Sequence, residues 1–303
     1  MEYLAIDIGG SKTRMVVFDK TNPEIEAYDT IGVGLAVDSE DDIPEFRSAV
    51  TRLAEKYNIC SVAVNLGGKN KGQIAKIIKE CLPQARVCVF RESEGTASLE
   101  FGKLFGADAV LLAGTGAIAV AKNPDGSSIV CGGWGMNISD AGSGYYIGLE
   151  AIKQSLSALD KQEPLTELQK EITGLVSPIS PMVDIADICA LRDTVRGNIG
   201  SLDRKNIASF CKTVVKHCKR KEPDALKIMR NAGDHLGLLV ADCVLKLSPY
   251  ETERVAVSGG LVNCLEFWQE SFEKVVKENC SAKEFIYDTN GVLLGTKAIA
   301  KKI

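Results

Sequence analysis

Short apolar runs alternate with glycine turns and with segments of helical period along most of the chain. Apolar residues at 3–8 and a β-branched run at 14–18 flank the segment 9–13, which predicts a β-hairpin closed by a glycine turn. Five further elements follow in the order helix, strand, helix, strand, helix, at about 43–57, 60–66, 74–82, 87–90 and up to Leu104. A hairpin followed by alternating strands and helices predicts a mixed sheet with helices on its faces.

The same pattern then begins again. A second hairpin is predicted at 109–113 and 117–121, followed by a turn at 123–126 and a strand into Cys131. The remaining predicted elements are long helices at about 141–160, 203–219 and 223–247, strands at 254–257 and 285–287, and a last helix at about 291–301. The segment 177–181 reads as a loop or hinge.

This repetition predicts an α/β protein made of two duplicated domains, each a mixed sheet flanked by helices. The last helix is expected to cross back to the first half. The first domain is therefore predicted to comprise residues 1–107 plus 290–303. The second is predicted to comprise residues 108–289.

The composition fits an ordinary soluble protein and narrows the classes of partner. The 303 residues are 45% hydrophobic and 25% charged, and the net charge of −4 argues against a broad basic surface for nucleic acid. No segment approaches the roughly 18 apolar residues of a membrane span, and no signal-like segment opens the chain. The ten cysteines contain no Cys-x-x-Cys pair, which favours reduced, buried thiols. We therefore expect a cytoplasmic protein with neither a nucleic-acid nor a membrane partner.

Three glycine turns at strand ends carry the candidate chemistry. Backbone amides in such turns form anion-binding concavities, and glycine lets the backbone approach a ligand closely. The candidate ligand-binding residues of these turns are Asp7, Gly9, Gly10, Ser11, Lys12 and Thr13, then Gly114, Thr115 and Gly116, then Ser258, Gly259 and Gly260. A carboxylate at the first strand end suits magnesium, which takes few protein ligands besides water and phosphate oxygens, so Asp7 is also the candidate metal ligand.

The three turns resemble the two phosphate motifs and the adenosine motif shared by actin, Hsp70 and the sugar kinases. The run 132–148, Gly-Gly-Trp-Gly-Met-Asn-Ile-Ser-Asp-Ala-Gly-Ser-Gly-Tyr-Tyr-Ile-Gly, is similar to a run of the N-acetylglucosamine kinases within the BadF/BadG/BcrA/BcrD-type ATPases. The segment 230–237 resembles a helix of that family whose Ala-Gly step lies near the adenine. Gly233 is therefore expected to lie near the adenine here. The resemblance implies actin-like (ribonuclease H-like) domains, ATP and magnesium as cofactors, and phosphate transfer to a hydroxyl of a sugar or amino sugar.

The resemblance also implies a cleft between the two domains, with the acceptor on the first domain and the nucleotide on the second. Kinases of this fold commonly place an aspartate at the tip of the strand that precedes the helix ending the first domain. Here Glu92 stands in that register and is expected to accept the hydroxyl proton; Glu94 and Asp140 are the alternatives. The expected acceptor contacts are Gly67, Gly68, Trp134 and Asp140.

Departures from the family pattern leave the acceptor open. Gly67-Gly68-Lys69 replaces the family's Gly-x-Asp, and Asp140-Ala141 replaces its Asp-Glu. Three hypotheses follow: a kinase acting on a sugar or amino sugar; an ATPase like the dehydratase activators, which hold an iron–sulfur cluster between two subunits; or a ligand-sensing relative without turnover. A homodimer is expected.

Overall fold

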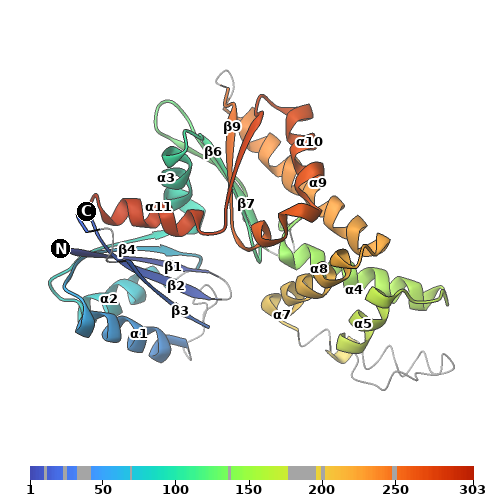
Figure 1. Cartoon of the computed structure of the whole chain (residues 1–303), viewed down its shortest axis with the longest axis horizontal. Helices are drawn as coiled ribbons and strands as arrows, with labels where there is room; N and C mark the ends of the chain where they lie inside the picture. The colour runs from blue at the N-terminus through green and yellow to red at the C-terminus, as the bar shows by residue number, and fades with distance from the viewer. Residues whose placement is uncertain are drawn as a thin grey trace.

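The structure, a computed structural model, describes residues 1–9, 12–22, 26–32, 42–68, 70–135, 138–176, 196–198, 202–247 and 251–303. Two five-stranded sheets form its two halves (Figure 1), in the strand orders β3-β2-β1-β4-β5 and β10-β9-β6-β7-β8. The strands of the first are β1 (Glu2–Ile8), β2 (Thr13–Asp19), β3 (Glu26–Ile31), β4 (Ile59–Leu66) and β5 (Arg86–Arg91). Those of the second are β6 (Ala109–Ala113), β7 (Ala117–Lys122), β8 (Ser128–Gly132), β9 (Arg254–Ser258) and β10 (Glu284–Asp288).

The two sheets repeat one plan. In each, an antiparallel hairpin and a third antiparallel strand are followed by two parallel strands, so β6 to β10 correspond to β1 to β5. The predicted fold, two duplicated mixed sheets flanked by helices, is confirmed.

The helices follow the same plan, with one insertion. Those of the first half are α1 (Ile43–Lys56), α2 (Lys71–Cys81) and α3 (Thr96–Leu104), and their counterparts are α9 (Pro223–Leu245), α10 (Gln269–Asn279) and α11 (Gly291–Ala300). Between β8 and α9 the second half also contains α4 (Gly144–Asp160), α5 (Glu167–Val176), α7 (Arg204–Ser209) and α8 (Cys211–Lys219). We call these four helices the inserted helices; Figure 1 shows them at the end of the molecule farthest from the chain termini.

A shared hydrophobic core joins the halves. It draws buried residues from both sheets and from α3 and α11, among them Phe18, Phe101, Val110 and Leu293. Figure 1 shows α11 leaving the second half and lying across the first sheet, as the sequence predicted. Glycine makes this packing possible, since a Cβ on Gly295 would lie 1.9 Å from the carbonyl oxygen of Ala97 in α3. The exact division into two domains at residues 107 and 290 stays a prediction.

Several details differ from the sequence-based elements. The single helix predicted over 203–219 is two helices, α7 and α8, joined at Phe210. At this joint the Ile207 carbonyl is directed toward α4, where it lies 1.9 Å from the position that a Cβ on Gly148 would take. The polar edge strand β3 and the short helix α5 were not predicted, and the loop predicted at 177–181 lies outside the described residues. Among the described helices, none is long and apolar enough to cross a membrane.

Candidate active site

A cleft of about 520 Å³ lies between the strand tips of the two halves. Most of the residues predicted from the sequence line it: Asp7, Gly9, Lys12, Gly67, Gly68, Glu92, Gly114, Thr115, Gly116, Asp140, Gly259 and Gly260. Gly10 and Ser11 lie outside the described residues. The sheet topology explains the convergence, because corresponding strand ends of both halves meet at this cleft.

Asp7 is the acidic centre of the first half. It stands directly opposite Arg14 in the β1–β2 hairpin, and its Oδ2 accepts a 2.5 Å bond from Arg14 Nη2. Its Oδ1 accepts from Asn65 Nδ2 at 2.9 Å, because the parallel pairing of β1 and β4 sets these residues side by side. The turn beyond is closed by the Gly9 amide, which donates to the Lys12 carbonyl at 3.0 Å. Thr13 is fully buried beside this turn and does not line the cleft.

The second glycine turn is held by the first of the inserted helices. At the N-terminus of α4, the Gly144 amide donates to the Gly114 carbonyl at 2.8 Å and the Tyr145 amide to the Thr115 carbonyl at 3.2 Å. Ser143 caps this helix, since its hydroxyl oxygen accepts from the Tyr146 amide. These bonds direct the Gly114 and Thr115 carbonyls toward α4, and the Gly116 carbonyl accepts from the Gly114 amide at 2.9 Å.

Asp140 and Arg204 form an ion pair beside this turn, and the Arg204 side chain is 38% exposed. Asp140 Oδ1 accepts from the Ala117 amide at 3.2 Å, and Oδ2 accepts from Arg204 Nη2 at 2.5 Å. The Asp140 side chain is only 2% exposed. Its predicted contact with the acceptor stays a prediction, although both carboxylate oxygens are already engaged within the protein.

Glu92 faces the cleft from the end of β5. It opens a single helical turn, Glu92–Glu94, which ends at Gly95 in the left-handed conformation with φ of 69°. Burial is the main reason that the pKa of Glu92 is raised from 4.5 to about 7. The charges of Asp7 and Asp140 raise this pKa further, whereas those of Arg204 and Arg14 lower it. The pKa of Glu92 therefore depends on charged residues of both halves.

Glu94 has different surroundings. Its carboxylate lies 3.6 Å from Lys71 Nζ, its side chain is 44% exposed, and it does not line the cleft. The geometry therefore favours Glu92 over Glu94 as the carboxylate that meets an acceptor.

The third turn packs onto the second. Gly259 has a φ of 113°, and a Cβ there would lie 2.4 Å from the Ala113 carbonyl oxygen. Ser258 lies behind the cleft, fully buried, and its hydroxyl has no hydrogen-bond partner within the described ranges. Gly233, predicted to lie near the adenine, serves helix packing here: a Cβ would meet the Trp268 carbonyl at 2.4 Å, and the residue does not line the cleft. Nucleotide contact by Gly233 and Ser258 stays a prediction.

Trp134 lies outside the cleft lining, although Gly133 and Gly135 on either side belong to it. Its side chain is exposed, with 77% of the residue surface accessible, and its amide donates to Ser139 Oγ at 2.8 Å. A contact with the acceptor would need the cleft to change shape, and it stays a prediction.

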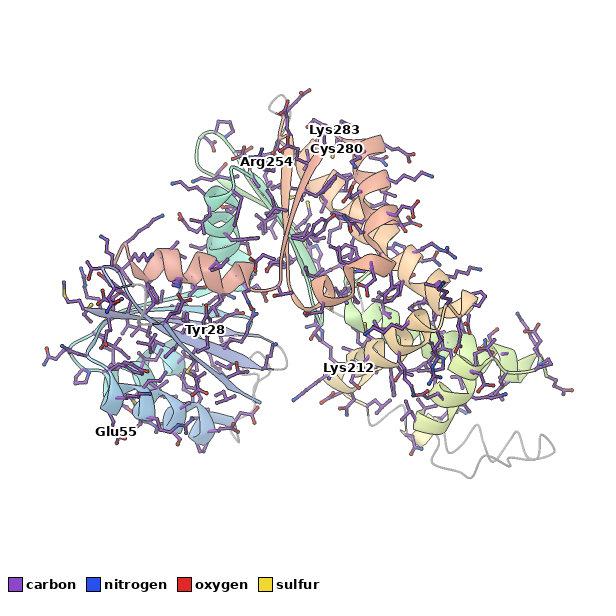
Figure 2. All side chains as sticks on the ribbon, in the orientation of Figure 1. Tyr28, Glu55, Lys212, Arg254, Cys280 and Lys283 are labelled. Carbon is purple, nitrogen blue, oxygen red and sulfur yellow. The ribbon has the colours of Figure 1, made fainter. Side chains whose placement is uncertain are left out.

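Cations that the sequence analysis did not single out also line the cleft: Arg14, Arg91, Arg204, Lys205 and Lys212. In Figure 2, Lys212 lies on the second half at the side that faces the first. Within the described part of the chain, Arg91, Lys205 and Lys212 have no carboxylate within ion-pair distance, and neither has Lys12. The cleft therefore offers positive charge that an anionic ligand would neutralise. Of these cations, only Arg14 could have been predicted from the sequence, because the register of the β1–β2 hairpin places it opposite Asp7.

The sequence was then compared with known protein families. It matches the BadF/BadG/BcrA/BcrD ATPase family over residues 4–292. This chain belongs to the BadF/BadG/BcrA/BcrD ATPase family. The resemblance stated from the glycine turns and the run 132–148 is thereby confirmed, and ATP use follows from membership of this family.

Two proteins with similar sequences are sugar kinases by name. The N-acetylmuramic acid/N-acetylglucosamine kinase of Clostridium acetobutylicum is 26% identical, and the match covers 99% of each chain. The N-acetyl-D-glucosamine kinase of Dictyostelium discoideum is 29% identical over 55% of this chain and 57% of its own length. A solved structure from Chromobacterium violaceum, named as a candidate N-acetylglucosamine kinase, has a TM-score of 0.69 at 21% identity and covers 97% of this chain and 98% of that one. The last likeness supports the fold.

Proposed function

We propose that this ATPase-family member is an ATP-dependent sugar kinase that phosphorylates a hydroxyl of an amino sugar. The observation that carries the proposal is that Glu92 of the first half and the glycine turn 114–116 of the second line one cleft. Phosphoryl transfer to an alcohol uses a carboxylate that accepts the hydroxyl proton, backbone groups that hold the phosphates, and magnesium that neutralises their charge. The names of both curated relatives agree with this activity.

The nucleotide phosphates are proposed to lie between the two hairpin turns. The amides of Thr115 and Gly116, the Thr115 hydroxyl and the Lys12 ammonium would contact them. The family's use of ATP supports this placement.

Asp7 is the residue proposed to hold magnesium. Its carboxylate already accepts bonds from Arg14 and Asn65, but a carboxylate has about four acceptor positions. Magnesium commonly takes only one or two protein carboxylates, with water and phosphate oxygens completing its shell. The donor set is therefore compatible with the ion, which would neutralise charge on the phosphates when bound.

Glu92 is the proposed general base. With a pKa raised to about 7, it is substantially ionised at neutral pH and can still take a proton from an alcohol. The rest of the reaction depends on positioning, which the turns and the closed cleft would provide.

The acceptor is proposed to be an N-acetylated amino sugar, including one that carries a carboxylate. The cations Arg91, Lys205 and Lys212 line the cleft without a carboxylate partner among the described residues, and the name of the Clostridium relative includes an acidic amino sugar. Arg91 is the best placed, because it precedes Glu92 at the tip of β5.

The test is an ATP-consumption assay against glucose, glucosamine, N-acetylglucosamine and N-acetylmuramic acid, with the sugar phosphate identified by mass spectrometry. We expect turnover with the N-acetylated sugars and a lower KM for the acidic one. ATP consumption that needs no sugar, or none with any sugar, would contradict the proposal. Light scattering tests the expected homodimer.

The dehydratase-activator alternative finds no support at Cys131. This thiol is buried, with 6% of the residue exposed, and accepts a bond from Lys246 Nζ at 3.2 Å. A colourless protein after anaerobic purification is the expected result, and a brown one would favour the activator.

A further inference from the structure

Arg204 is a cleft residue that neither the sequence motifs nor the family resemblance marks. It begins α7, which belongs to the inserted helices and has no counterpart in the first half. Asp203 caps this helix by accepting a 2.7 Å bond from the Asn206 amide, which fixes the direction in which the helix starts. Arg204 is thereby presented to the cleft across 64 residues of sequence from Asp140.

The guanidinium lies directly against the second glycine turn. A Cβ on Gly116 would lie 2.1 Å from Arg204 Nη2 and 2.8 Å from Asp140 Oδ1, so the arginine head occupies the space that any other residue at 116 would fill. Asp140 holds it there by bridging the Ala117 amide and Nη2. The head group is therefore fixed at the turn proposed to bind phosphate.

Not all N–H donors of this guanidinium have a hydrogen-bond partner among the described residues. Nη2 donates to Asp140, whereas the Nε–H is buried and has no hydrogen-bond partner among the described residues. A guanidinium carries five N–H donors in a planar fork that matches phosphate oxygens. Leaving a buried donor without a partner is unfavourable, which points to a ligand that completes its bonds.

Arg204 also acts on the proposed base across the cleft. Its positive charge lowers the pKa of Glu92, so the two groups lie within electrostatic range of each other. A phosphoryl group passing from the nucleotide to an acceptor held at Glu92 must cross the same space.

We propose that Arg204 binds the transferring phosphoryl group and stabilises the charge that it develops during transfer. Asp140 is then a positioning residue, which holds the guanidinium against the turn instead of contacting the acceptor. This inference rests on the proposed kinase function, since it assigns a further residue to the same reaction.

The test compares Arg204→Gln and Arg204→Lys with a matched control, Arg220→Gln. Arg220 is an exposed arginine at the end of α8, outside the cleft lining. Loss of one donor aimed at developing charge typically lowers kcat by about 100- to 1,000-fold. We expect that loss in Arg204→Gln, a change in KM for ATP of less than about threefold because ground-state binding is retained, and wild-type kinetics for Arg220→Gln.

Arg204→Lys distinguishes binding of the phosphoryl group by Arg204 from a purely structural role of its ion pair with Asp140. A lysine keeps an ion pair with Asp140 but lacks the planar fork. If Arg204 only holds α7 against the turn, the lysine variant should recover most of the activity. That recovery, or a kcat of Arg204→Gln within threefold of wild type, would overturn the inference.

A second readout remains decisive if no sugar is phosphorylated. Calorimetry measures the binding of magnesium-ADP with aluminium fluoride, a mimic of the transferring phosphoryl group, to wild type and to Arg204→Gln. We expect fluoride to strengthen ADP binding in wild type and not in the variant. Absence of sugar turnover contradicts the kinase proposal, whereas equal fluoride enhancement in both proteins contradicts the assignment of Arg204.

Asp140→Asn distinguishes the two roles of Asp140. As a positioning residue it should lower kcat with little change in acceptor KM, because the bond to the Ala117 amide can remain and the ion pair cannot. A raised acceptor KM with unchanged kcat would return Asp140 to the acceptor site.

Discussion

The two halves share one topology but bring different groups to the cleft. At corresponding strand ends the first half places the carboxylates of Asp7 and Glu92 and the amide of Asn65, whereas the second places Leu112, Ser258 and the turn before α11. The second half instead contributes backbone turns and the inserted helices, which hold the turn 114–116 and add Arg204. The duplicated topology thus positions the cleft, and the candidate catalytic groups lie at the positions where the two halves differ.

One contact links both copies at their junction. Arg14 Nη1 donates to the Thr289 carbonyl at 3.0 Å and to Asn290 Oδ1 at 2.7 Å, while Nη2 binds Asp7. Asn290 precedes α11, the place that Glu92 and its turn hold before α3. The second copy of this strand end therefore serves attachment, and the first serves chemistry.

The largest expected effect is at Glu92. Glu92→Gln should lower kcat by about 100- to 10,000-fold, the usual contribution of general-base assistance, while calorimetry shows ATP affinity close to wild type because the proposed nucleotide contacts lie elsewhere. Glu94→Gln is the matched control, since Glu94 is exposed beside Lys71. Full activity in Glu92→Gln, or a larger loss in Glu94→Gln, would contradict the assignment.

The two glycine turns can be compared directly. A Cβ on Gly116 would collide with Arg204 Nη2, whereas one on Gly9 would meet only the Lys12 carbonyl at 3.4 Å, an ordinary contact. Gly116→Ala should displace the guanidinium and lower kcat by about 10- to 100-fold. The upper end of this range equals the smallest effect expected when one charge-stabilising donor is removed. Gly9→Ala should have a much smaller effect, and equal effects of the two substitutions in steady-state assays would contradict the asymmetry.

The features that the sequence predicts are those encoded by patterns within a short stretch of residues. The hairpins follow from apolar runs around glycine turns, and Glu92 follows from its place after a buried strand. Strand β3 was missed because its alternating polar residues, such as Glu26 and Asp29, give little hydrophobic signal. Arg204 was missed for a different reason: its position at Gly116 depends on how the inserted helices pack, and no local pattern encodes that.

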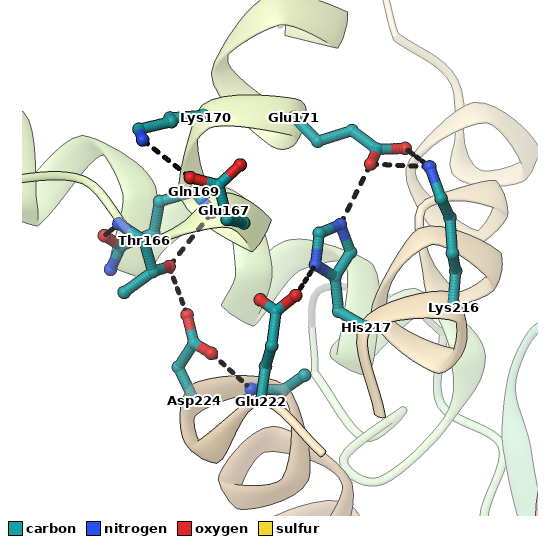
Figure 3. Close-up of polar contacts among 10 residues, drawn as sticks. Thr166, Glu167, Gln169, Lys170, Glu171, Lys216, His217, Glu222 and Asp224 are labelled. Carbon is teal, nitrogen blue, oxygen red and sulfur yellow. Dashed lines mark hydrogen bonds and ion pairs between the residues drawn. The ribbon is translucent and has the colours of Figure 1, made fainter. Parts of the chain in front are cut away.

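The inserted helices have a polar connection of their own, which Figure 3 shows. His217 of α8 is 1% exposed and lies between Glu171 of α5, at 2.9 Å, and Glu222 before α9, at 2.7 Å. His217→Gln should destabilise the protein by about 2 kcal/mol, the scale of hydrogen bonds to charged groups, measured by urea unfolding. Lys216→Gln removes a half-exposed partner of Glu171 and should change stability by less than about 1 kcal/mol. Equal losses would mean that burial of His217 does not matter.

The next comparison concerns the pH dependence of activity in wild type and in Arg204→Gln. Because Glu92 must be ionised to accept a proton and its pKa is raised to about 7, kcat/KM should fall about tenfold for each unit below that pH. Arg204→Gln removes a charge that lowers this pKa, so its residual activity should begin to fall at a higher pH than that of wild type. A flat profile between about pH 5 and 8 would contradict a titrating Glu92.

Stability provides a readout of Glu92 that does not depend on turnover. A carboxyl whose folded pKa lies above its unfolded value of 4.5 binds more protons in the folded state between 4.5 and about 7, so its ionisation destabilises the fold as pH rises through that window. Below 4.5 both states are protonated and Glu92 contributes nothing; above 7 the destabilisation is complete. Glu92→Gln should therefore melt at a higher temperature than wild type at pH 8 and at nearly the same temperature at pH 4. A corresponding change at the second-half equivalent, Asn290→Asp, should introduce no titration in this window, because the Arg14 guanidinium beside it favours an ionised carboxylate.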